Sequence, residues 1–290
     1  MEKKSDHHVF FDILKLFGFL SVYVILSSCF QVAGIYMLGK QFSLHFFEKL
    51  SASESLFITI LNTITISLLF WYKRKSLGLK RVTLAIRRSL LLRFILVGLI
   101  SSLAVIILIA VLLAIYQPYI LKFNADFSFL DFCLYFVLFI VAAFNEELLC
   151  RAILLHYLLQ RNSALLSLII SSSMFTFLHL GNPNFDLISF VNIFCAGMLL
   201  GLLYIYSGKN LYLPVIFHAG WNFFQGPLLG FAVSGFKFRS TLFTVESPIK
   251  FSQMQFGLEG TMACTYVSLF VITALSFYLY VNREKHDVSL

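Results

Sequence analysis

The chain has 290 residues, of which 59% are hydrophobic and 12% charged, and its formal net charge at pH 7 is +8. Soluble domains carry about 25% charged residues, so the composition excludes an ordinary soluble domain and indicates a multi-pass integral membrane protein. The basic residues cluster beside apolar runs, where anionic lipid headgroups would lie. This placement argues against nucleic acid as a partner and favours a bilayer with anionic headgroups.

Taken in chain order, the apolar runs predict eight transmembrane helices joined by short loops. The runs are long enough to cross the hydrocarbon layer, and breakers such as Pro118 and the stretch 181–184 separate neighbouring runs. We therefore expect an all-α fold with an intramembrane polar cavity. The predicted helices cover residues 14–38, 56–71, 94–116, 129–159, 164–180, 187–206, 211–231 and 262–281.

The chain is expected to form one membrane domain with three functional parts. Residues 1–128 hold the N-terminal helices and a basic cytoplasmic segment, residues 129–231 form a catalytic core, and residues 232–290 hold an external loop and the last helix. Within the first part, residues 76–93 read either as an amphipathic helix on the inner leaflet or as a plain basic loop. With eight crossings, most loop lysines and arginines fall on one side. The positive-inside rule then places both termini in the cytoplasm, and the membrane is expected to be the cell membrane.

A cluster of three charged residues lies near the middle of the apolar run at 129–159, namely Glu146, Glu147 and Arg151. Each charge at a helix centre costs roughly 2.5–3.5 kcal/mol on insertion scales, so such a cluster is kept only if it is paired, hydrated or used. Glu147 and Arg151 are four residues apart and can pair on one helix face. Glu146 points about 100° away, which favours a chemical role for it as a general base. The alternative is that ion pairs in the bundle interior hold both glutamates.

Two later helices add imidazole and amide groups. His179 ends the predicted helix at 164–180, and His218 and Asn222 are four residues apart in the next helix but one. Separately, His179 reads as an ordinary core or interfacial residue and the His218/Asn222 pair as a polar contact between helices. Together with Glu146 they are the residue types that intramembrane hydrolysis needs: a carboxylate to deprotonate water, an imidazole to orient it, and donors for the oxyanion. Glu146, His179 and His218 are also candidate ligands of Zn²⁺.

Three motifs in this order resemble the CAAX protease and bacteriocin-processing (Abi) family, which includes the type II CAAX prenyl endopeptidases. The resemblance covers roughly residues 130–225, and each motif alone is far less specific than the set. The motifs are Glu146-Glu147-x-x-x-Arg151, Phe175-x-x-x-His179 and His218-x-x-x-Asn222.

The resemblance implies an eight-helix intramembrane endopeptidase acting on a membrane-associated peptide or protein. By this resemblance Glu146 activates the water, His179 helps to bind water or metal, and His218 with Asn222 stabilises the oxyanion. Eukaryotic members of the family remove a tripeptide from prenylated CAAX proteins. Bacterial members are linked to bacteriocin immunity, peptide maturation or protein scaffolding.

By the same resemblance Glu147 and Arg151 shape the site, and Zn²⁺ is a candidate cofactor. Two other functions remain open at this point. One is a non-catalytic immunity or scaffolding protein of the same family. The other is a transporter that couples intramembrane carboxylates to protons, although neither inverted repeats nor paired broken helices are seen in the sequence.

Overall fold

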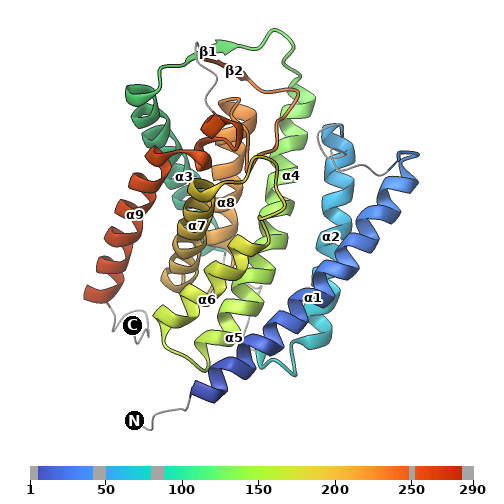
Figure 1. The fold of residues 1–290 in the computed structure, drawn as a ribbon, viewed down its shortest axis with the longest axis vertical. Coiled ribbons are helices and arrows are strands. Elements are labelled where there is room, and N and C mark those ends of the chain that lie inside the picture. Colours follow the sequence, from blue (N-terminus) through green and yellow to red (C-terminus); the bar gives the residue numbers. More distant parts are fainter. Residues whose placement is uncertain (1–5, 42–49, 80–87, 248–251, 283–290) are drawn as a thin grey trace.

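Long apolar runs separated by short polar breaks fold into a nearly all-helical chain, shown as a computed structural model in Figure 1. The structure describes residues 6–41, 50–79, 88–247 and 252–282. Residues 80–87 of the segment 76–93, which reads either as an amphipathic helix or as a plain basic loop, lie outside these residues. The long helices are α1 (Asp6–Met37), α2 (Ala52–Lys73), α3 (Arg88–Tyr116), α4 (Phe129–Glu147), α6 (Ala164–Phe177), α7 (Leu187–Tyr206), α8 (Tyr212–Phe223) and α9 (Met262–Val281).

Helix length separates these elements into two groups. Six helical stretches among the described residues are long and apolar enough to cross a membrane, so the chain is a multi-pass membrane protein. They are Val9–Met37, Ala52–Lys73, Arg88–Tyr116, Phe129–Leu159, Leu187–Tyr206 and Met262–Val281. The segments predicted at 164–180 and 211–231 are helical but shorter, since α6 has 14 residues and α8 has 12. Eight crossings therefore stay a prediction.

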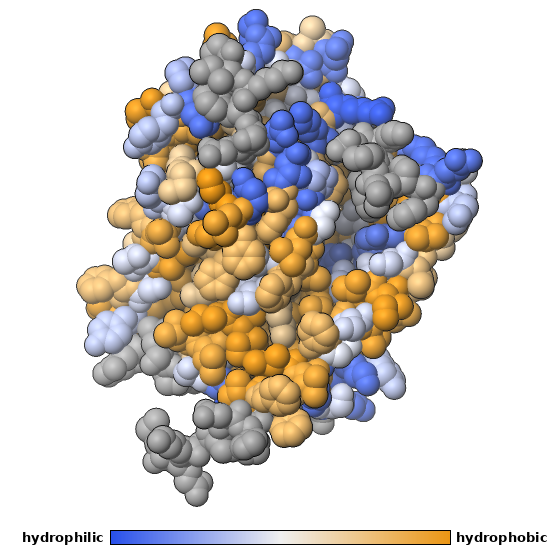
Figure 2. Space-filling model, viewed as in Figure 1, coloured by the Kyte–Doolittle hydropathy of each residue, from blue (hydrophilic) through white to orange (hydrophobic). Residues whose placement is uncertain are grey.

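Apolar side chains cover the middle of the visible face, and hydrophilic ones gather towards its upper end (Figure 2). In the same orientation, α1 begins and α9 ends at the lower end of the bundle (Figure 1). Side chains such as Phe17 of α1, Ile100 of α3 and Phe270 of α9 are more than 60% exposed. A lipid environment accounts for so much exposed apolar surface better than water does.

The helix predicted at 129–159 is continuous but is not α-helical throughout. At Leu148 the α-helix α4 gives way to the π-helix η3 (Leu148–Leu155), which is followed by the short helix α5 (His156–Leu159). Helix α8 likewise continues as a π-helix, η4 (Phe224–Leu228), which contains Pro227. Wide turns of this kind are uncommon and are often found at functional sites. Both π-helices directly follow α-helices that carry residues of the polar motifs.

A small sheet departs from the all-α expectation. Strand β1 (Ile120–Phe123) pairs antiparallel with β2 (Phe243–Glu246), so that Ile120 lies opposite Glu246. An exposed ion pair joins Lys122 Nζ to Glu246 Oε2 at 2.6 Å. Strand β2 lies within the segment 232–261 that was expected to be a simple external loop. That segment also contains two short 3₁₀ turns, η5 (Ser252–Gln255) and η6 (Leu258–Gly260).

Helix α8 lies inside the bundle and packs against α3, α4 and α7. Glycines allow the closest approach to α3: a Cβ at Gly220 would collide with Ser102 Oγ, and one at Gly98 would meet Ile216 Cγ2 at 2.7 Å. This close packing fixes the depth and the rotation of the helix that carries His218 and Asn222.

Candidate active site

The last turn of α4 and the first turn of η3 bring the charged residues together. Arg151 Nε lies 3.1 Å from Glu147 Oε2, and both side chains are at most 1% exposed. The predicted pairing of these two residues is therefore present. Arg151 Nη2 also donates a hydrogen bond to the carbonyl oxygen of Gly197 at 3.0 Å, and its guanidinium lies over the ring of Phe175. These contacts lower the cost of burying the pair.

Glu147 has a second partner, which orients one of the histidines. Its Oε1 atom lies 2.9 Å from Nδ1 of His218 in α8. An ionised carboxylate only accepts hydrogen bonds, so Nδ1 of His218 must be the protonated nitrogen. The other ring nitrogen, Nε2, then faces Glu146 Oε2 at 3.9 Å. Glu147 thus connects Arg151 behind it to the imidazole in front of it.

His179 is oriented in the same way by a backbone carbonyl. It follows the end of α6, in the turn before α7, and its Nδ1 lies 2.8 Å from the carbonyl oxygen of Phe175. Because a carbonyl can only accept, this nitrogen also carries the proton. Its Nε2 lies 3.9 Å from Glu146 Oε2. Two imidazoles from distant segments therefore present their Nε2 atoms to one carboxylate oxygen.

The resulting cluster has acceptors but lacks a donor. Glu146 Oε2 is buried and has no hydrogen-bond partner among the described residues. In their neutral forms both histidines offer it only the lone pair on Nε2. Such a group is stable only with an added proton, a water molecule or a cation between its members. The Glu146 side chain as a whole is 35% exposed, so water can reach it.

These residues line a cavity of about 460 Å³. Four of the six predicted site residues contribute to its wall: Glu146, His179, His218 and Asn222. Glu147 and Arg151 are not part of the wall; they lie behind His218 and support it. Further parts of the wall come from α4, from α1 and α2, and from residues 233–239.

The contribution of α1 was not anticipated from the sequence. Tyr23 Oη donates a hydrogen bond to Asn145 Oδ1 at 3.1 Å, next to Glu146, and Ser27 Oγ donates one to Asn62 Oδ1 of α2 at 3.0 Å. Tyr23, Ser27 and Gln31 follow one another at four-residue spacing and all line the cavity. A polar stripe at helical spacing in an otherwise apolar helix was the signal that could have revealed this wall.

The predicted metal ligands have suitable chemistry but unsuitable spacing. Each of the two histidines donates its Nδ1 proton to an acceptor, as metal-bound histidines usually do. Two ligands on one tetrahedral Zn²⁺ lie only about 3.3 Å apart, given bonds of about 2.0 Å, whereas each Nε2 is 3.9 Å from Glu146 Oε2. Across the described ranges, no group of three or more His, Cys, Asp or Glu residues is placed to hold a metal ion. The trio as arranged does not have the spacing of a Zn²⁺ centre, and Zn²⁺ as a cofactor stays a prediction.

The comparisons with known proteins agree with the motifs. Residues 127–224 match the family model described as type II CAAX prenyl endopeptidase Rce1-like. The resemblance seen in the sequence is thereby confirmed over this stretch. The match runs from just before α4 into the start of η4, and so contains every residue of the acceptor cluster. No curated protein matches the chain.

Proposed function

We propose that the protein is an intramembrane endopeptidase that hydrolyses a membrane-associated peptide. The observation that carries this proposal is the convergence of Nε2 of His179 and Nε2 of His218 on Oε2 of Glu146 at the wall of a cavity. A water molecule between these atoms would donate hydrogen bonds to acceptors that otherwise have none, and separations of 3.9 Å suit such a bridge. The match to the Rce1-like family supports a protease and favours a prenylated CAAX-type substrate.

In the proposed reaction, Glu146 takes a proton from the bound water while the water oxygen attacks the scissile carbonyl carbon. The C=O electron pair moves to the carbonyl oxygen, and the amide group of Asn222 donates a hydrogen bond to this oxyanion. In the doubly protonated form of His218, Nε2–H would add a second donor to the oxyanion, and the water would then donate its two hydrogen bonds to Glu146 and His179. When the tetrahedral intermediate collapses, the C–N bond breaks. The proton held by Glu146 then passes to the leaving amine.

We also propose that the chain crosses the membrane eight times, with α6 and α8 as short crossings, and that both termini are cytoplasmic. The beginning of α1 and the end of α9 at the same end of the bundle support an even number of crossings (Figure 1). The short length of α8 suits a helix that other helices surround, since most of its side chains are buried in protein.

The test is cleavage of a farnesylated, internally quenched peptide with a C-terminal CAAX sequence by the full chain in detergent. The change Glu146→Gln keeps the shape of the side chain and removes the base, and it should lower kcat by about 10²–10⁴-fold. The matched control is Glu246→Gln, an exposed glutamate in β2, which should cleave like the wild type. Full cleavage by Glu146→Gln would refute the proposed role of this residue.

An unprenylated version of the same peptide separates substrate classes. Cleavage of both peptides would leave the peptidase proposal intact and refute the preference for a prenyl group. If neither is cleaved while all variants still bind a partner or protect cells, the non-catalytic function is the correct one.

A further inference from the structure

A second buried carboxylate, Glu259, lies close to the cluster and has no place in the proposed reaction. It belongs to η6, the 3₁₀ turn before α9, and is 4% exposed. No ion pair between Glu259 and a cation occurs within the described ranges. An ionised carboxylate buried without a cation is costly unless several donors solvate it. The groups that donate hydrogen bonds to the Glu259 carboxylate therefore indicate its structural role.

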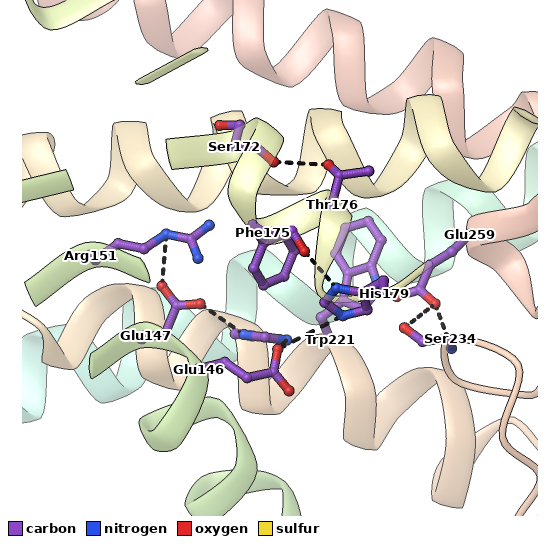
Figure 3. Close-up of polar contacts among 11 residues, drawn as sticks. Glu146, Glu147, Arg151, Ser172, Phe175, Thr176, His179, Trp221, Ser234 and Glu259 are labelled. Atoms are coloured by element: carbon purple, nitrogen blue, oxygen red, sulfur yellow. Dashed lines mark hydrogen bonds and ion pairs between the residues drawn. The ribbon is translucent and has the colours of Figure 1, made fainter. Parts of the chain in front are cut away.

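Its two oxygen atoms bind two different parts of the chain (Figure 3). Glu259 Oε1 accepts a hydrogen bond from Nε1 of Trp221 at 3.2 Å. Glu259 Oε2 accepts two hydrogen bonds from Ser234, one from its backbone N–H at 2.7 Å and one from its hydroxyl at 3.0 Å. One carboxylate thus joins helix α8 to the segment 233–239.

The hydrogen bond from Trp221 to Glu259 holds α8, the helix that carries His218 and Asn222. On α8, Trp221 lies three residues after His218 and one residue before Asn222. Residues three apart share a helix face, so a bond that fixes the indole also fixes the rotation of His218. Trp221, Glu259 and His179 line one small cavity of about 20 Å³. The carboxylate therefore acts on the wall directly behind the proposed water site.

The Ser234 contact holds a strained turn. Ser234 has a φ angle of +47°, a left-handed conformation that costs a residue with a Cβ of the order of 1–2 kcal/mol. The next residue, Gly235, donates its N–H to the carbonyl oxygen of Phe256 at 3.0 Å. Without an acceptor for its own N–H, Ser234 would relax from this conformation, and the adjoining cavity wall would move with it.

Glu259 is itself held in place through its backbone. Its carbonyl oxygen accepts a hydrogen bond from Asn192 Nδ2 of α7 at 2.7 Å, and Asn192 Oδ1 accepts one from Thr265 Oγ1 of α9, also at 2.7 Å. Two membrane-spanning helices therefore fix the position from which the carboxylate reaches the wall. A rigid support of this kind is what a precisely oriented site requires.

We propose that Glu259 is a positioning residue of the peptidase site: its carboxylate holds Trp221 and Ser234 so that His218 and Asn222 face Glu146. The catalytic part of this inference rests on the proposed function. The structural part, a carboxylate that joins α8 to residues 233–239, does not depend on it.

The experiment compares the full chain with Glu259→Gln and Trp221→Phe, with Glu246→Gln as the matched acid-to-amide control. Turnover of the farnesylated quenched peptide is measured per folded molecule, after size-exclusion chromatography. Both site variants should lower kcat by about 10- to 100-fold, the effect of losing a hydrogen bond to a charged group, and should change KM by less than about threefold on the same basis. Because glutamine has one acceptor oxygen in place of two, Glu259→Gln cannot keep both contacts, and the double variant should lower kcat by less than the product of the two single effects.

Hydrogen exchange of the peptide around Ser234 provides a readout that does not depend on activity. Its amide should be protected in the wild type and in Glu246→Gln, and should exchange faster in Glu259→Gln. If Glu259→Gln does not fold, Trp221→Phe carries the kinetic test, because it removes one N–H and keeps an aromatic ring.

A Glu259→Gln or Trp221→Phe variant with kcat within threefold of the wild type would overturn the positioning role. If the wild type cleaves no peptide, the proposed function fails, and exchange alone then decides whether Glu259 holds the wall. Unchanged exchange at Ser234 in Glu259→Gln would overturn that contact as well.

Discussion

Replacing Arg151 by methionine tests how the buried charges are held. The side chain is 1% exposed, and its partner Glu147 is 0% exposed. Removing the cation would leave a buried carboxylate whose remaining partner is His218. Losing one member of a buried pair typically costs about 3–5 kcal/mol. We expect Arg151→Met to lower the free energy of unfolding by about this amount.

The double variant Glu147→Gln/Arg151→Met separates stability from catalysis. With both charges gone, most of the lost stability should return, because a neutral pair of similar volume carries no desolvation penalty. Activity should not return, since a glutamine side chain can present its own N–H₂ group to Nδ1 and so no longer fixes the tautomer of His218. Stability should therefore recover in the double variant while peptide cleavage stays low.

The assay is unfolding of the purified protein in detergent by titration with SDS, followed by tryptophan fluorescence, together with peptide cleavage. The control is Lys122→Met, which removes the cation of an exposed pair and should cost less than about 1 kcal/mol. Two results would refute the reasoning: an Arg151→Met protein within about 1 kcal/mol of the wild type, or a double variant no more stable than the single one.

Three further outcomes are expected. Tyr23→Phe should lower stability by about 1 kcal/mol through the lost hydrogen bond to Asn145, and equal unfolding curves would contradict this. Gly220→Ala should destabilise the protein by about 1–3 kcal/mol because its Cβ would collide with Ser102 Oγ; adding Ser102→Ala should recover part of the loss, and no recovery would place the strain elsewhere. Finally, 1,10-phenanthroline should leave peptide cleavage unchanged, because the cluster around Glu146 is not spaced for a metal; inhibition that added Zn²⁺ reverses would show that the residues close around an ion.

Much of the site follows from helical spacing. The four-residue interval between Glu147 and Arg151 predicts their contact, and the structure contains it. The same interval places His218 and Asn222 on one face of α8, and both line the cavity. Helical periodicity is sufficient to predict these positions because residues four apart on one helix lie on the same face.

Contacts between distant segments could not be predicted in this way. The pairing of His218 with Glu147 joins residues 71 positions apart, and that of Tyr23 with Asn145 joins residues 122 apart. Helix packing sets such contacts, and no sequence period encodes them. Glu259 illustrates the point: it was visible as a charge in a glycine-flanked turn, but its partners become apparent only when α8 and residues 233–239 are placed beside it.

The π-helix after Glu147 has a consequence for natural variation in this chain. A π turn holds one residue more than the α turn it replaces. Deleting a single residue from 148–155 would let the segment rewind as an α-helix, and the residues beyond it would keep nearly the same rotation, because the wide turn had absorbed the extra residue. The same deletion within α4 would instead rotate one side of the helix against the other by about 100°. A library of one-residue deletions along α4 and η3 should therefore reveal a zone of greater tolerance that begins directly after the paired glutamates.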